Sequence, residues 1–398
     1  MSDADLPTVE AALDTLLAEH DPKAEGYHEF RGHQFDAGLA WVYFAKGEGG
    51  LGLAPQLQRV INKRLAEAGA PTTDPSQFFM MLAGPTIANH GDDAVKERFL
   101  RPMFTGEERW CQLFSEPGAG SDFAGLGTKA VRDGDEWLVN GQKVWNTLAH
   151  IADFGMLVTR TDPDKPKHKG MTYFALDMKA DGVDVRPLRQ ITGEAEFNEV
   201  YLTDVRVPDA HRIGAQGEGW RASLTTLMNE RNAIGGGGGG GGPSLGGGAI
   251  GHLVTIYKNN PDAQSATTRD EVMQLWIRAE ALRLTNMRAA QLARSGNPGP
   301  EGSVGKSMMA NLNQDIWEKA VDLQGMAGQI DFDYTFRRPE TTDMTGDGPG
   351  YAFLRARANS IEGGTTEIMK NILGEQVLGL PGEPRVDKEI PWIDVPRG

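Results

Sequence analysis

The sequence predicts an α+β fold of several domains, in which helical segments precede and follow a central β-rich segment. Apolar residues recur at helical spacing up to about residue 108 and again after about residue 213. Short β-rich runs separated by turn signals fill the stretch between them. Because 398 residues exceed the roughly 250–300 that one core usually serves, we expect domains over 1–108, 109–212 and 213–398.

The N-terminal domain is expected to be helical. Helical periodicity is visible over 9–18, 56–68 and 94–99, and glycine and proline clusters divide these stretches.

The central domain is expected to be a β domain because its apolar runs alternate with turn signals, among them Asp133-Gly134-Asp135. The dipeptide Asn140-Gly141 is typical of two-residue hairpin turns. We therefore predict a hairpin over 136–145 that reverses at Asn140-Gly141.

Helical periodicity returns in the C-terminal domain. Leu224, Leu227 and Met228 recur at helical spacing, as do apolar residues over 272–282 and 308–323. The run 235–242 consists of eight consecutive glycines. Each glycine costs about 1 kcal/mol in a helix interior, so we expect a loop or a frayed helix there.

Composition excludes several classes of function. The net charge of −15 argues against a nucleic-acid partner. No apolar run approaches the roughly 20 residues of a membrane span, and the first residues lack a targeting pattern, so we expect a cytoplasmic protein. The single cysteine, Cys111, excludes an internal disulfide and is expected to be a buried apolar residue. His150 and His168 fit no metal-ligand spacing, and we predict no metal.

The segments 114–122 and 141–147 are the most informative for chemistry. Taken alone, the first is a turn rich in glycine and serine that exposes backbone N–H groups to an oxygen-rich ligand. Trp145 offers a flat surface on which an aromatic cofactor could stack. The alternative is a tight loop packed on a core tryptophan.

The order of four motifs, EPGAGSD, NGQKVW, DVRVP and GEGW, resembles the acyl-CoA dehydrogenase family of bacterial type, as do the segments 47–53 and 364–368. The resemblance implies an N-terminal helical domain, a central β-barrel-like domain and a C-terminal four-helix bundle. It also implies FAD-dependent α,β-dehydrogenation of an acyl-CoA thioester in fatty acid β-oxidation, with electrons passed to an electron-transfer flavoprotein. A homo-oligomer, dimer or tetramer, is expected, and a hetero-oligomer is an alternative.

The resemblance implies cofactor contacts at positions that match the family's motifs. These positions are Phe114, Ser115, Gly120, Ser121, Trp145, Thr147, Gln324, Gly328, Thr365 and Glu367. It implies substrate contacts at Ser121, Glu230 and Gly363. Ser115 replaces a common threonine and keeps its hydroxyl, whereas Ala327 replaces a glycine of the family's QxxGG turn.

Two glutamates are candidates for the base that removes the α-proton. Glu362 lies near the position at which many family members carry the base, but the anchor at 364–368 places Gly363 there instead. A shift of one residue moves a side chain by about 3.5 Å along an extended chain. We therefore prefer Glu230 and keep Glu362 as the alternative. Arg231 is expected to orient the base, and the competing interpretation of Glu230 is a buried ion pair.

One family element, the Arg-x-x-Phe-Gly segment that grips the adenine end of FAD, is missing at 249–260. Its absence keeps open a non-catalytic or half-site partner subunit of a heteromeric dehydrogenase. An acyl-CoA oxidase or flavin monooxygenase on the same fold is a further alternative, which the length of the chain disfavours.

Overall fold

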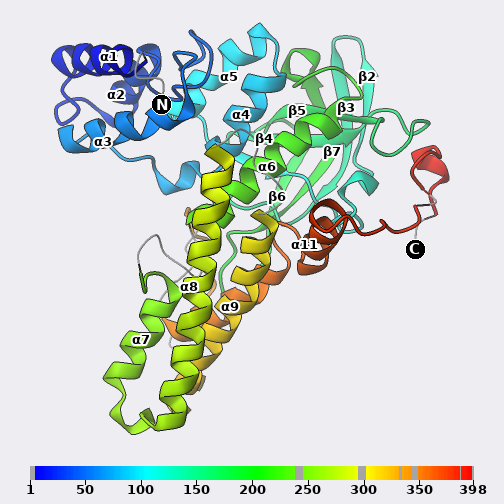
Figure 1. The fold of residues 1–398 in the computed structure, drawn as a ribbon. Helices are drawn as coiled ribbons and strands as arrows, with labels where there is room; N and C mark the ends of the chain where they lie inside the picture. Colours follow the sequence, from blue (N-terminus) through cyan, green and yellow to red (C-terminus); the bar gives the residue numbers. More distant parts are fainter. Residues whose placement is uncertain are drawn as a thin grey trace. The chain divides into compact units, whose positions relative to one another are not determined.

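The computed structural model describes residues 5–237, 245–294, 302–330, 334–341, 348–385 and 387–396 (Figure 1). The chain divides into two compact units. The first comprises Met1–Leu188, Glu196–Thr226 and Asp387–Gly398, and the second comprises Arg189–Ala195 and Leu227–Val386.

The first unit begins with helices, as predicted. They are α1 (Leu6–Glu19), α2 (Tyr27–Asp36), α3 (Gln58–Ala68), α4 (Met80–His90) and α5 (Asp93–Thr105). Val9, Leu13 and Leu16 lie one helical turn apart on α1 and are buried, so they form one apolar stripe. Gly69 and Gly106 end α3 and α5 with φ of 83° and 85°, a left-handed conformation that glycine adopts without strain.

A seven-stranded sheet follows, as predicted. Its strands are β1 (Trp110–Leu113), β2 (Lys129–Asp133), β3 (Glu136–Lys143), β4 (Phe154–Arg160), β5 (Met171–Asp177), β6 (Val183–Pro187) and β7 (Asn198–Pro208). The strand order is β1-β4-β2-β3-β7-β6, and β5 pairs with β4. Trp137, Leu176 and Val205 belong to the apolar core of the sheet. Cys111 belongs to it as well and is fully buried, which confirms its predicted role and raises the pKa of its thiol.

The predicted turn at Asn140-Gly141 is wrong. β3 runs straight through these residues, and the hairpin reverses earlier, at Gly134, which has a φ of 64°. Gly141 is needed for a close approach, because a Cβ there would lie 2.3 Å from the Thr128 hydroxyl. The Asn140 side chain donates to and accepts from Asp204 on β7 at 3.0 Å, across an irregularity in the β3–β7 register. The dipeptide therefore lies at a β-bulge in this strand.

Helix α6 (Gly219–Gly237) begins in the first unit and ends in the second. Its inward face differs from the predicted one, because Leu224 and Met228 are exposed whereas Ser223 and Thr226 are buried. The Thr226 hydroxyl lies 3.1 Å from that of Tyr173, so this polar face is satisfied. The helix includes the first three glycines of the run 235–242, and 238–242 lie outside the described residues.

The second unit is helical, and its core agrees with the predicted bundle. Its helices are α7 (Ala249–Asn259), α8 (Ala266–Arg294), α9 (Gly302–Asp322), α10 (Pro349–Ala356) and α11 (Thr366–Ile372). Leu253, Leu282 and Ile316 come from α7, α8 and α9 and are buried in one apolar cluster, to which α10 contributes Ala352. Figure 1 shows α7, α8 and α9 side by side. None of the helices in the described ranges combines the length and apolar character needed to cross a membrane.

Candidate functional site

In the first unit, β1 delivers the chain to the predicted cofactor loop at 114–121. The Phe114 ring is buried and stacks on Phe123, with centroids 4.8 Å apart. The Ser115 carbonyl accepts a hydrogen bond of 2.9 Å from the Val144 backbone. Beyond this anchor, Gly120 and Ser121 are exposed, and a Cβ at Gly120 would meet nothing within 4 Å. The backbone at Gly120 is therefore open on this side among the described residues.

A buried ion pair of Lys143 and Glu116 binds the backbone of this loop. The Lys143 side chain is fully buried, and its Nζ donates to the Phe114 carbonyl at 3.0 Å and to Glu116 at 2.8 Å. Burial lowers the pKa of Lys143, and Glu116 opposes the shift. Burial alone would raise the pKa of Glu116, but Lys143 and hydrogen bonds from Gly127 and Thr128 lower it overall. Sequence reasoning did not select either residue of this pair.

Trp145 projects from the chain in a strained conformation. Its φ is 62°, in the left-handed region that bulky residues rarely adopt, and its side chain is 60% exposed. Its neighbours Val144 and Asn146 are buried, and the Asn146 backbone N–H donates to the Asn198 carbonyl at 3.0 Å. Anchors on both sides hold the strain in place. Trp145 is thus an exposed aromatic surface rather than a core residue, and Thr147 beside it is half-buried.

In the second unit, a buried lysine lies among the candidate glutamates. Lys306 on α9 is 2% exposed, and its Nζ donates to the carbonyls of Asn359 (2.9 Å) and Gly364. Burial lowers its pKa, and this shift is opposed by three nearby carboxylates. These carboxylates belong to Glu362, Glu367 and Glu230. Both candidate bases therefore interact electrostatically with one ammonium group.

Glu362 is held firmly by its neighbours. Arg355 is buried and grips both oxygens of the Glu362 carboxylate, at 3.2 and 3.0 Å. The Asn359 side-chain amide donates a further hydrogen bond at 2.7 Å. A bidentate contact between an arginine and a carboxylate is among the strongest charge-assisted contacts in proteins. Any reaction that protonates Glu362 has to weaken these three bonds.

The predicted loop at 363–367 turns sharply and then starts a helix. Gly363 and Gly364 have φ of 62° and 98°, which favour glycine. The Thr365 hydroxyl caps α11 by accepting from the Ile368 backbone at 3.2 Å. Glu367 is exposed in the first turn of that helix. Thr365 therefore has a local structural role besides any role in cofactor binding.

Gln324 lies where the family's pyrophosphate-binding turn is expected. It precedes the short helix Gly325–Gln329, which contains Gly328, and it lines a hollow of about 520 Å³. His252 and Trp317 line the same hollow, with their ring centroids 5.7 Å apart.

Glu230 is half-buried on α6, four residues after the buried Thr226, and so continues the polar face of that helix. Arg231 follows on the helix backbone, and its side chain lies outside the described part.

Models of three protein domains match the chain. They are the N-terminal domain of acyl-CoA dehydrogenase at residues 8–107, its middle domain at 111–205 and its C-terminal domain at 217–378.

Two relatives from Mycobacterium tuberculosis are similar over most of this chain. Acyl-CoA dehydrogenase FadE34 is 40% identical over 83% of this chain, and the match spans 43% of its own length, so the matched part of this chain covers less than half of that relative. Acyl-CoA dehydrogenase IpdE1 is 34% identical over 88% of this chain and 86% of its own. Among solved structures, the ChsE4-ChsE5 complex of the same organism is similar at a TM-score of 0.68 with 27% identity, covering 95% of this chain and 97% of the other.

Proposed function

The chain belongs to the acyl-CoA dehydrogenase family, whose members are oxidoreductases that act on acyl-CoA, and we propose on this basis that it oxidises the Cα–Cβ bond of an acyl-CoA thioester with FAD. The product is the trans-2-enoyl-CoA, and the electrons pass to an electron-transfer flavoprotein. Glu230 is the proposed base.

The residues of the first unit fit a flavin. Trp145 offers an exposed aromatic surface, and the backbone at Gly120 and Ser121 is open to a ligand. When bound, FAD supplies a hydride acceptor. Phe114, Ser115 and Thr147 complete the proposed contacts in this unit. In the second unit, Gln324, Gly328, Thr365 and Glu367 are the proposed cofactor contacts.

The observation that carries the choice of base is the binding of Glu362 by Arg355 and Asn359. Three donors already occupy the oxygens of this carboxylate, so it is not free to turn toward a substrate carbon. We assign Glu362 the role of fixing the loop, and Glu230 the role of removing the α-proton. Arg231 orients Glu230 in this proposal.

The loop that Glu362 fixes supplies the other proposed contact with the substrate. Lys306 binds the carbonyl of Gly364 and Arg355 binds Glu362, so both ends of this short turn are tied to helices of the second unit. The backbone N–H of Gly363 then donates to the thioester oxygen, where negative charge develops as the proton leaves. Ser121 is the proposed substrate contact in the first unit.

The purified chain alone tests the proposal. We expect a yellow protein with about one FAD per subunit whose flavin absorbance bleaches when an acyl-CoA is added without oxygen. A bleached protein that is rapidly reoxidised by oxygen would indicate an oxidase or monooxygenase instead. A chain that binds FAD but is bleached by no acyl-CoA would contradict the proposal.

A second candidate, a half-site partner subunit, is favoured by one observation. The segment in which the family's Arg-x-x-Phe-Gly element is expected forms the regular helix α7, which carries neither the arginine nor the Phe-Gly pair. The solved ChsE4-ChsE5 complex shows that a similar chain occurs in an assembly of two named components. A colourless protein that gains flavin only after a second protein is added would favour this candidate over a homo-oligomer.

For the acyl group we propose a bulky or branched chain. The glycines at 235–237 follow Glu230 within α6 and offer no side chains to fill the space beside it. A panel of acyl-CoA substrates tests this, with the run substituted by leucine for comparison. Fastest turnover with short straight chains, and no effect of leucine, would contradict it.

Lys306→Met should move the acid limb of the pH profile for flavin bleaching to higher pH. The substitution removes a positive charge that interacts with Glu230, the proposed base, and the loss of a nearby positive charge disfavours the ionised form of a carboxylate. Two backbone carbonyls also lose their donor, which should lower the free energy of unfolding by about 2–3 kcal/mol. Bleaching rates from pH 5 to 9 and urea unfolding measure the two effects, with about tenfold slower bleaching expected at the acid end.

Lys319→Met on the same helix is the matched control, because Lys319 pairs with Glu271 at 2.8 Å on the outside of the bundle. It should change stability by about 1 kcal/mol or less and leave the pH profile in place. If both variants and the unmodified chain have the same pH profile, Lys306 has no effect on the base.

A further inference from the structure

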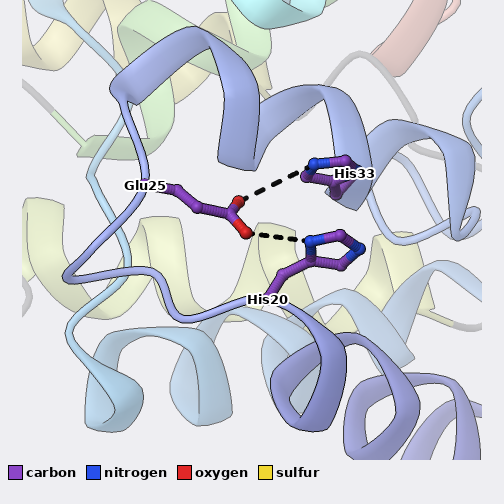
Figure 2. Close-up of side chains that lie close together, drawn as sticks. All are labelled: His20, Glu25 and His33. Carbon is purple, nitrogen blue, oxygen red and sulfur yellow. Dashed lines mark hydrogen bonds and ion pairs between the residues drawn. The ribbon is translucent and has the colours of Figure 1, made fainter.

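His20, Glu25 and His33 come together in the first unit, far along the chain from the motifs of the proposed active site. His20 caps the C-terminus of α1, Glu25 lies in the connection to α2, and His33 lies in the last turn of α2. Figure 2 shows the Glu25 carboxylate pointing at both imidazole rings. Its two oxygens lie 2.9 Å from His20 Nδ1 and 3.8 Å from His33 Nε2. We infer that these three residues bind a divalent transition-metal ion, Zn²⁺ in the first place.

The donor set has the chemistry that zinc takes. Two imidazole nitrogens and one carboxylate form a His₂Glu set, which zinc uses with a water molecule in the fourth position. One donor atom from each residue lies within 4.8 Å of the others. Ligand atoms around a tetrahedral zinc ion lie about 3.3 Å apart, given bonds of about 2.0–2.1 Å. Small side-chain rotations that bring His33 toward Glu25 therefore close the site.

The two imidazole rings of the cluster are neighbours. They are stacked, with centroids 3.5 Å apart and planes at 14°. A metal ion binds an imidazole through a nitrogen that carries no proton. A proton on the ligating nitrogen of His20 or His33 passes to solvent when the ion binds.

A second observation points to a cation. Glu25 Oε2 is buried and has no hydrogen-bond partner among the described residues. A buried carboxylate oxygen without a partner is costly, and a cation bound to it would remove that cost. His33 Nε2, which forms an ion pair with this oxygen if it is protonated, lies 3.8 Å away, which is too far for a hydrogen bond.

The site is accessible to an ion from solvent. The side chains of His20 and His33 are 25% and 34% exposed, so neither is sealed in the core. A hollow of about 490 Å³ adjoins them and is lined by α1 and α2, with Thr15, Glu19 and Asp36 among the residues. Asp36 is already held by Arg101 through two bonds of 2.9 Å, which disfavours it as a fourth ligand. An ion bound here would fasten the end of α1 to α2.

Titration of the chelator-stripped full-length protein with ZnCl₂, followed by calorimetry and by competition with a chromophoric chelator, tests the inference. We expect one equivalent of zinc to bind with an affinity that depends on all three residues. At zinc 100 times above Kd, the Tm should rise by about 3 °C. His20→Gln, Glu25→Gln and His33→Gln should each weaken binding at least about 100-fold, since losing even a partner of a ligand costs about 10–100-fold.

His28→Gln is the matched control. His28 lies on the same helix as His33, but its Nδ1 lies 2.9 Å from the Thr105 carbonyl, outside the cluster. This variant should bind zinc like the unmodified chain, and all variants should keep their flavin bleaching, because none touches the proposed active site. Circular dichroism of the zinc-free variants shows whether they fold. Unmodified protein that binds no zinc, or folded ligand variants that bind as tightly as His28→Gln, would overturn the inference.

Discussion

Glu230→Gln should slow flavin bleaching by acyl-CoA about 1,000-fold while FAD stays bound. The substitution keeps the size of the side chain and removes only its ability to accept a proton, and a positioned general base contributes about 10²–10⁴ to a rate. The α-proton then has no acceptor on α6, although the substrate can still bind. Stopped-flow absorbance at the flavin band, with FAD content measured separately, distinguishes lost chemistry from lost cofactor.

Glu362→Gln is the comparison that makes this result informative. Glutamine keeps one oxygen that can accept from Arg355 but has no negative charge. We therefore expect the free energy of unfolding to fall by about 1–3 kcal/mol. Bleaching should slow by about tenfold or less, because the loop is loosened and the base is intact. If Glu362→Gln stops bleaching and Glu230→Gln does not, Glu362 is the base and our assignment is wrong.

Much of the fold follows from local patterns in the sequence. Helical periodicity located α1, α3 and α5, and the change to short alternating runs located the sheet. The prediction of a turn at Asn140-Gly141 was wrong because the same dipeptide also occurs within a strand, and the sequence does not show which other strand it will pair with. Gly141 is placed by the nearby Thr128 hydroxyl, and Asn140 by Asp204, which is 64 residues away. Such contacts exist only once the strands have paired.

The inward face of α6 was mispredicted for a related reason. Apolar spacing favoured Leu224 and Met228, but Ser223 and Thr226 are buried instead, next to Ala222, and their hydroxyl groups find partners. A polar face buried against other polar groups has no periodic apolar signal. Glu230 follows Thr226 by one helical turn and so lies on the polar face of this helix.

Motif order identified residues of the candidate site that are exposed, such as Ser121 and Trp145, and it did not identify the charged residues that support them. Lys143 and Lys306 are almost completely buried, and each binds a backbone carbonyl of a candidate loop, that of Phe114 and that of Gly364. A signal was present on α9, where Lys306 precedes the buried Met309 and Ala310 by three and four residues. A lysine on an apolar helix face needs a buried partner, and the sequence alone does not name that partner.

No sequence pattern marks His20, Glu25 and His33 as metal ligands. Their separations of five and eight residues fit no common ligand spacing. The three side chains meet only because of the angle between α1 and α2.

The buried ion pair of Lys143 and Glu116 should be worth more to stability than any exposed pair of the chain. Lys143→Met should lower the free energy of unfolding by about 3–5 kcal/mol, because Glu116 would keep a buried charge without its partner. Methionine fills a similar volume, so the loss reflects charge and hydrogen bonding rather than a cavity. Urea unfolding measures it. Lys129→Met on β2 is the control, since Lys129 is exposed and should change stability by about 0.5 kcal/mol or less.

The same variant tests how the cofactor loop is held. Lys143 is a donor to the Phe114 carbonyl, so its loss should loosen 114–121 and weaken FAD retention as well as stability. Glu116→Gln in the Lys143→Met background removes the unpaired charge but keeps an oxygen that can accept from Gly127 and Thr128. It should recover part of the lost stability without restoring the bond to Phe114. A stability loss below about 1 kcal/mol for Lys143→Met would mean that water replaces the ammonium group and that the pair does not support the loop.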